Sequence, residues 1–99
     1  MVTAHAFSAE LWRYDGETGW SFLSLPTELA DAIQEESGSL AKGFGSVKVS
    51  VRIGSSQWAT SVFPDRTRRT YLLPVKKSVR LTEGLDAGDT IQVELTVVQ

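Results

Sequence analysis

Hydrophobic and polar residues alternate along most of this chain, in short segments separated by glycine or proline. The alternation is most regular at residues 46–53, where every odd position from Val47 to Ile53 is a branched aliphatic residue and every even position is polar. A period of two predicts a β-strand with one buried face and one wet face. Similar patterns predict five further strands, at residues 4–14, 20–25, 57–63, 70–75 and 90–98.

Two segments have a helical spacing instead. Pro26 precedes residues 27–36, in which Leu29 and Ile33 are four apart, and Val75 and Val79 have the same spacing at residues 76–83. Apolar residues four apart share one helix face, so each short helix is expected to dock on the strands through a narrow stripe. Gly84 then suits a left-handed C-terminal cap.

About six strands and two short helices in 99 residues predict one mainly β domain, residues 1–99. Six strands bury enough apolar area at this length only if the sheet closes or folds over on itself. We therefore expect a small closed or partly open β-barrel. The Asp15-Gly16 pair between the first two strands predicts a tight hairpin turn, and residues 64–69 form a polar, basic connection.

The composition is that of an ordinary globular protein, with 41% hydrophobic and 22% charged residues. The absence of cysteine excludes disulfides and favours a cytoplasmic location. The chain starts without a signal-peptide pattern and has no apolar run long enough for a membrane span, so no membrane association is expected.

Catalytic, metal and cofactor chemistry are poorly supported. His5 is the only histidine, so a zinc site would depend on carboxylates, which suit zinc badly. Gly43-Phe44-Gly45 lacks the rest of a dinucleotide fingerprint, and no serine lies in a nucleophile elbow. Asp86 and Asp89 could form a catalytic pair of carboxylates, but they suit a turn better, because Asp side chains there accept hydrogen bonds from backbone N–H groups. We expect Asp89 to tie that turn to a neighbouring loop through buried hydrogen bonds. No catalytic residue, metal or cofactor is predicted.

The candidates for ligand binding are basic and aromatic. The net charge is −2, but bases concentrate in residues 65–80 and acids in residues 1–36. Clustered bases can hold a phosphate or carboxylate, or follow a nucleic-acid backbone. Trp12 is expected on the wet face or in a groove, because alternation points it away from Phe7 and Leu11. The candidate ligand-binding residues are Arg66, Arg68, Arg69, Lys76, Lys77, Arg80, Trp12 and Trp58.

Four segments in order resemble one known family. They are WSFLSLP at residues 20–26, VKVSVRIG at 47–54, TSVFP at 60–64 and YLLPVKKSVR at 71–80, followed by Gly84-Leu85 and Gly88-Asp89. Together they resemble DUF1905, a bacterial and archaeal domain-of-unknown-function family. The resemblance covers nearly the whole chain and implies a small closed β-barrel, but no activity.

Two function hypotheses remain open from the sequence. The first is a non-enzymatic module that binds a small anionic ligand or a protein partner through the basic residues and a tryptophan wall. The alternative is a nucleic-acid-binding homodimer, by analogy with swapped-hairpin barrel regulators, although an acidic pI of about 5.3 argues against it. The oligomeric state is left open.

Overall fold

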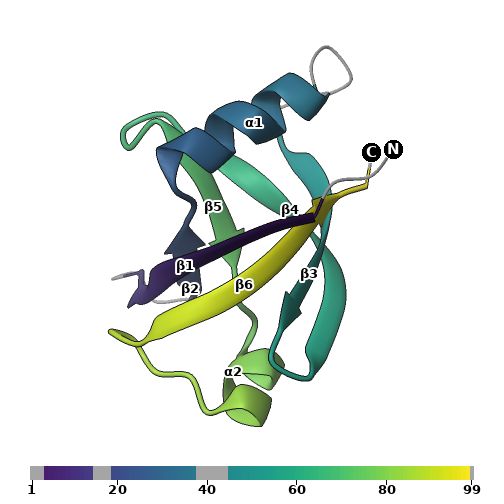
Figure 1. The fold of residues 1–99 in the computed structure, drawn as a ribbon. Helices are drawn as coiled ribbons and strands as arrows, with labels where there is room; N and C mark the ends of the chain where they lie inside the picture. The colour runs from purple at the N-terminus through teal and green to yellow at the C-terminus, as the bar shows by residue number, and fades with distance from the viewer. Residues whose placement is uncertain (1–3, 15–18, 38–44, 99) are drawn as a thin grey trace.

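The computed structural model describes residues 4–14, 19–37 and 45–98, which form a closed six-stranded barrel with two helices (Figure 1). All neighbouring strands are antiparallel, in the order β1-β2-β5-β4-β3-β6. The mainly β class and the barrel are therefore confirmed. The Asp15-Gly16 turn and residues 38–44 lie outside the described residues. The elements are β1 (Ala4–Arg13), β2 (Ser21–Ser24), α1 (Thr27–Ser37), β3 (Val47–Ile53), β4 (Ser56–Asp65), β5 (Thr70–Pro74), α2 (Lys77–Glu83) and β6 (Thr90–Val97).

The barrel closes because its two longest strands each change partner along their length. Residues Ala4 to Glu10 of β1 pair with β6, and Leu11 to Arg13 pair with β2. In β4, residues 56–62 pair with β3 and residues 63–65 pair with β5. The two strands thus form corners that join a β6–β3 side to a β2–β5 side, and each of the six strands has two neighbours.

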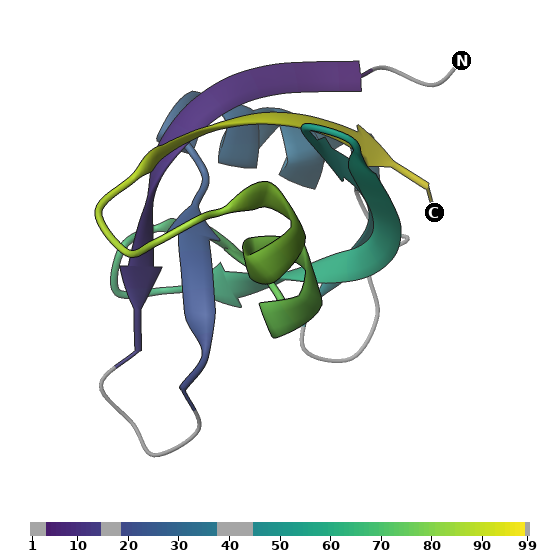
Figure 2. The ribbon, with the colours of Figure 1, turned by 90° about the horizontal axis from the view of Figure 1, so that it is seen from below.

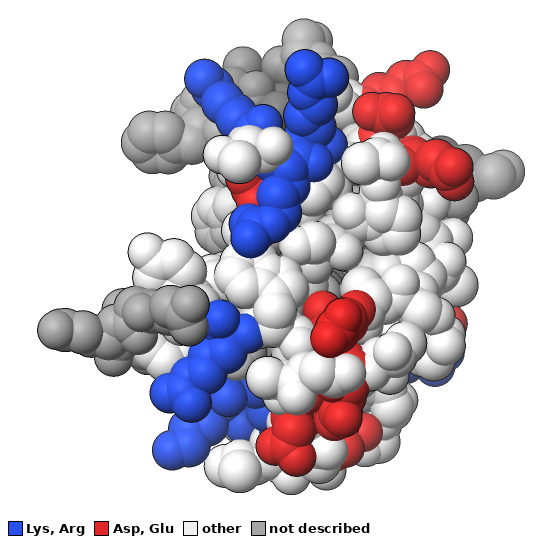
Figure 3. Space-filling view, turned by 90° about the vertical axis from the view of Figure 1, so that its left-hand side faces the viewer, with Lys and Arg blue, Asp and Glu red and all other residues white. Residues whose placement is uncertain are grey.

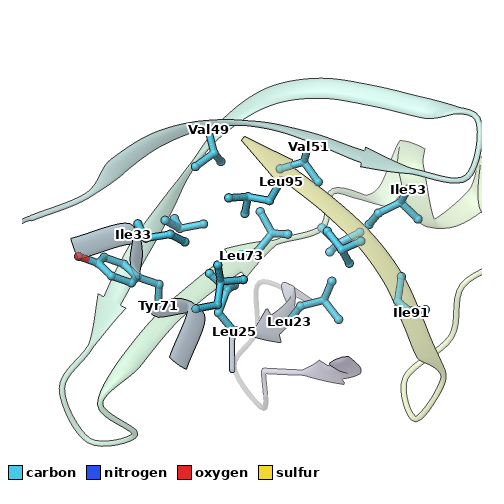
Figure 4. Close-up of a cluster of buried hydrophobic side chains, with 14 of the residues drawn as sticks. Leu23, Leu25, Ile33, Val49, Val51, Ile53, Tyr71, Leu73, Ile91 and Leu95 are labelled. Carbon is cyan, nitrogen blue, oxygen red and sulfur yellow. The ribbon is translucent and has the colours of Figure 1, made fainter. Parts of the chain in front are cut away.

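The core lies inside the barrel, where the alternating strands place their aliphatic residues. Val49, Val51 and Leu95 are completely buried, and Leu23 and Leu73 meet them from the opposite side (Figure 4). Their polar neighbours on the same strands face outward, as the period of two predicts. Burial of this apolar surface supplies the main stabilisation of the fold.

The two helices close the two ends of the barrel. Helix α1 lies at one end (Figure 1), and α2 lies across the other opening, seen from below in Figure 2. The side chains of Leu29 and Ile33 on α1 and of Val79 on α2 are buried. Gly84 ends α2 in the left-handed conformation, with φ 66° and ψ 42°, and its N–H donates to the carbonyl of Arg80. The predicted docking faces and the predicted cap are therefore confirmed.

The structure differs from the sequence prediction at Pro64. We expected a connection from this residue onward, but β4 continues through Pro64 to Asp65. Pro64 lies opposite Tyr71, whose carbonyl accepts a hydrogen bond from Leu25 on the other side of β5. The polar backbone atoms of Pro64 therefore point away from β5, toward β3, whose ladder with β4 reaches only Val62. A proline fits here because its missing N–H faces the unpaired side.

Candidate functional site

An apolar groove runs across the outside of the barrel over β1, β2, β5 and β4. The strand register builds it, because Trp12 lies opposite Phe22, Phe22 opposite Pro74, and Phe63 opposite Leu72. These side chains alternate with the core residues and so point outward. The groove has a volume of about 620 Å³ and is lined by Trp12, Tyr14, Trp20, Phe22, Phe63, Pro64, Asp65, Arg66, Arg68, Leu72 and Pro74.

Three aromatic rings along the groove contact one another in sequence. The rings of Trp20 and Phe22 are stacked with centroids 6.0 Å apart, and those of Phe22 and Trp12 are tilted at 5.2 Å. The indole N–H of Trp12 donates a 2.9 Å hydrogen bond to the hydroxyl of Ser24, which orients the ring. The three rings form the floor of the groove, and ring packing and this hydrogen bond hold the floor in place before a ligand binds.

Part of the groove is open to water. Tyr14 is 54% exposed, Trp20 50% and Phe63 46%, which is unusual for large apolar side chains. A contiguous apolar surface of this kind is typical of a binding site on a soluble domain.

One end of the groove carries charge. Arg68 forms a 2.7 Å ion pair with Asp65, and its guanidinium carbon lies 4.6 Å from the centre of the Trp12 ring. Asp65 also accepts hydrogen bonds from the backbone N–H groups of Thr67 and Arg68. The hydrogen bond from the Arg68 side chain is the main cause of the lowered pKa of Asp65. Asp65 therefore stays ionised and holds the Arg68 guanidinium over the indole.

The structure brings together only some of the candidate residues. Trp12, Arg66 and Arg68 line the groove. Trp58 packs against the core and, with Lys76, lines a separate hollow of about 350 Å³ between α2 and the β3–β4 hairpin. Arg69, Lys77 and Arg80 line neither hollow, and the Arg80 side chain donates to the carbonyl of Val75.

The six basic candidates form two groups rather than one patch. Arg66, Arg68 and Arg69 precede β5, whereas the three from Lys76 onward follow it, at the α2 end of the barrel (Figure 1). The five extended residues of β5 alone span about 17 Å. On the face shown in Figure 3, Lys and Arg atoms form two groups, with uncharged atoms between them.

Sequence reasoning missed most of the groove's apolar wall. The sequence patterns predict strands, but no binding site, at five of its residues: Tyr14, Trp20, Phe22, Phe63 and Leu72. A local signal was available, because the segments around residues 12–14 and 20–25 carry apolar residues on both faces of a strand. A strand with only one buried face is expected to carry polar residues on the other face, so the extra apolar residues indicate a second apolar surface.

Glu83 and Asp89 have structural roles. Glu83 accepts hydrogen bonds from the hydroxyls of Ser55 and Ser56, and the bond from Ser56 is the main cause of its lowered pKa. Asp89 accepts the N–H of Asp86 within their turn. This bond is exposed and local, so the expected buried tie to another loop is wrong; the backbone of Leu11 attaches the turn to β1 instead.

Within residues 4–14, 19–37 and 45–98, no three His, Cys, Asp or Glu side chains gather as a metal site. In the same part of the chain, no helix has the length and apolar character to cross a membrane.

Comparison with known proteins identifies the family of this chain. No curated protein matches it. The model of the family described as "Domain of unknown function (DUF1905)" matches residues 7–95, which covers all but the two ends and includes every residue that lines the groove. The chain therefore belongs to the DUF1905 family.

Proposed function

We propose that this domain is a non-enzymatic binding module whose aromatic groove takes a small ligand with a flat apolar body and a negatively charged group. The apolar body lies on the floor formed by Trp12, Phe22 and Trp20. The charged group lies at the end that carries Arg66 and Arg68. Of the six basic candidates, only Arg66 and Arg68 belong to the proposed site.

One observation carries the proposal: Arg68 lies 4.6 Å from the centre of the Trp12 ring while Asp65 holds it. A guanidinium has five N–H donors, and the Asp65 ion pair uses an Nη1 donor. Arg68 is 54% exposed, so its other donors can meet a ligand that enters along the groove. A cation fixed beside an aromatic floor suits a molecule that is flat at one end and anionic at the other.

The size and composition of the groove support a small ligand. Small-molecule sites usually have volumes of roughly 300–1,000 Å³ and apolar walls with a few placed polar groups. The groove has about 620 Å³, and its charged lining residues are Asp65, Arg66 and Arg68.

A protein partner is the second candidate. Tryptophan, tyrosine and arginine are enriched at the centres of protein interfaces, and half-exposed Trp20 and Tyr14 fit that composition. The separation of the basic residues into two groups does not favour a continuous nucleic-acid surface, which is the third candidate.

Titration with 1-naphthoate, followed by the indole N–H signals of 15N-labelled protein, tests the proposal. The signals of Trp12 and Trp20 should shift with a common dissociation constant, while Trp58, in the other hollow, serves as an internal control. Tryptophan-to-phenylalanine variants assign the three signals.

Two matched variants complete the experiment. Arg68→Gln should weaken binding, whereas Arg69→Gln, on the same turn but outside the groove lining, should not. The proposal fails if saturating naphthoate moves none of the three signals, moves Trp58 alone, or binds Arg68→Gln as tightly as the parent.

A further inference from the structure

The charged end of the groove holds three ionised side chains close together. Two are guanidinium groups, Arg66 and Arg68, and one is the carboxylate of Asp65. Together they leave a single net positive charge facing the ligand. The Asp65 carboxylate cannot move away easily, because it accepts two backbone N–H bonds as well as the Arg68 ion pair.

An anion that binds Arg68 must share it with Asp65. The Asp65 oxygen is 2.7 Å from Nη1 of Arg68, so an anion on the remaining donors of the same guanidinium lies within a few ångströms of the carboxylate. The first negative charge of a ligand gains from both arginines. A second negative charge gains less, because Asp65 repels it at the same short range.

The donor geometry favours a planar anion. A guanidinium presents pairs of parallel N–H groups that match the two oxygens of a carboxylate. The Arg68 guanidinium lies over the Trp12 ring, beside the floor on which the ligand body would rest.

From these contacts we infer that the groove selects planar aromatic monocarboxylates and rejects dianions such as phosphate monoesters. The inference rests on the proposed function and deepens it: Asp65 is the residue that sets the charge of the ligand. It acts as a specificity-determining residue by lowering the net positive charge that Arg66 and Arg68 present.

Three probes that share one ring system test the inference, namely 1-naphthoate, 1-naphthyl phosphate and 1-naphthamide. The affinities are measured by calorimetry and by the indole N–H signals, at about pH 8, because the second phosphate pKa is about 6. The parent protein should bind naphthoate most tightly. Asp65→Asn, which keeps an oxygen for the backbone N–H bonds, should raise the affinity for naphthyl phosphate about tenfold more than that for naphthoate.

Asp31→Asn on α1, an exposed position outside the groove lining, is the matched control and should leave the order of affinities unchanged. Arg66→Gln leaves Asp65 and its contacts intact, and it should weaken both anionic probes. If Asp65→Asn does not fold, the order of affinities in the parent protein still tests the inference.

The possible failures are distinguishable. If naphthyl phosphate binds the parent as tightly as naphthoate does, or if Asp65→Asn changes both affinities equally, the charge selection is overturned while the binding site stands. If naphthamide binds as well as naphthoate, the anionic part of the proposed function fails. If no probe binds, both proposals fail.

Discussion

The carboxylate of Glu83, at the end of α2, accepts a 2.7 Å hydrogen bond from the hydroxyl of Ser56, the first residue of β4. The same carboxylate oxygen accepts a 2.9 Å bond from the hydroxyl of Ser55. The residues are 27 and 28 positions apart in the chain. Glu83 thus fastens the helix that covers one end of the barrel to the β3–β4 hairpin.

Replacement of this carboxylate should loosen α2. In Glu83→Ala both serine hydroxyls lose their acceptor, so we expect a small decrease in the melting temperature and faster amide hydrogen exchange in α2 than in the parent. Glu83→Gln keeps an oxygen acceptor and should lose less. Equal exchange rates in α2 for parent and Glu83→Ala would show that the fastening has no effect.

The stability of the domain should decrease in acid, with Glu83 and Asp65 as contributors. A hydrogen bond from Ser56 lowers the pKa of Glu83 below its ordinary value of 4.5. A hydrogen bond from Arg68 lowers the pKa of Asp65 below its ordinary value of 3.8. A group whose pKa is lower when folded stabilises the fold above its unfolded pKa, and this contribution is lost as the pH falls through the folded pKa. The melting-temperature advantage of the parent over Glu83→Gln should therefore shrink between about pH 6 and about pH 3. An advantage that stays constant over this range would contradict the assignment.

Gly54 is required at the β3–β4 turn for two separable reasons. Its φ is +59°, which L side chains rarely adopt, and a Cβ there would collide with the Glu83 carboxylate. Gly84 has a similar φ of +66°, but open space surrounds its Cβ position. Gly84→Ala should therefore cost about 1 kcal/mol for backbone strain alone, and Gly54→Ala should cost more.

Chemical denaturation of both variants measures the difference. In a Glu83→Ala background the extra cost of Gly54→Ala should disappear, because the atoms that collide are gone. An extra cost that persists in this background would mean that the collision is not its source.

Leu73 should be among the most sensitive core positions. It is completely buried at the centre of the barrel (Figure 4), whereas Leu81 on α2 is 72% exposed. Leu73→Ala should lower the free energy of unfolding by about 2–5 kcal/mol, since it leaves a cavity among packed side chains. Leu81→Ala is the matched control and should change it by less than about 0.5 kcal/mol. Similar losses for the two variants would contradict the core assignment.

Much of the architecture follows from local patterns in the sequence. The alternation from Val47 to Ile53 predicts a strand with one buried face, and all four aliphatic residues are buried in the barrel. The spacing of Leu29 and Ile33 predicts how α1 docks, and Gly84 predicts where α2 ends. These features depend on neighbours within a few residues, so the chain itself contains the information.

The extent of β4 could not be predicted in the same way. Pro64 reads locally as the end of a strand. It is accommodated because the ladder between β3 and β4 stops at Val62, and because the backbone carbonyl of Tyr71, opposite Pro64, faces Leu25 instead. Whether a proline interrupts a sheet depends on which side of the strand has a partner.

Local patterns in the sequence are enough to predict a small barrel with aliphatic residues inside, two helices outside and Trp12 on the outer face. Which of the outward residues meet depends on the tertiary structure. Trp12, Phe22, Phe63 and Arg68 come from three strands and a turn, and they adjoin because antiparallel pairing sets Phe22 opposite Trp12 and Phe63 opposite Leu72. The same pairing separates Trp58 and Lys76 from the groove. Alternation specifies the face of a strand, but register and strand order specify its neighbours, and these arise only when distant parts of the chain pair.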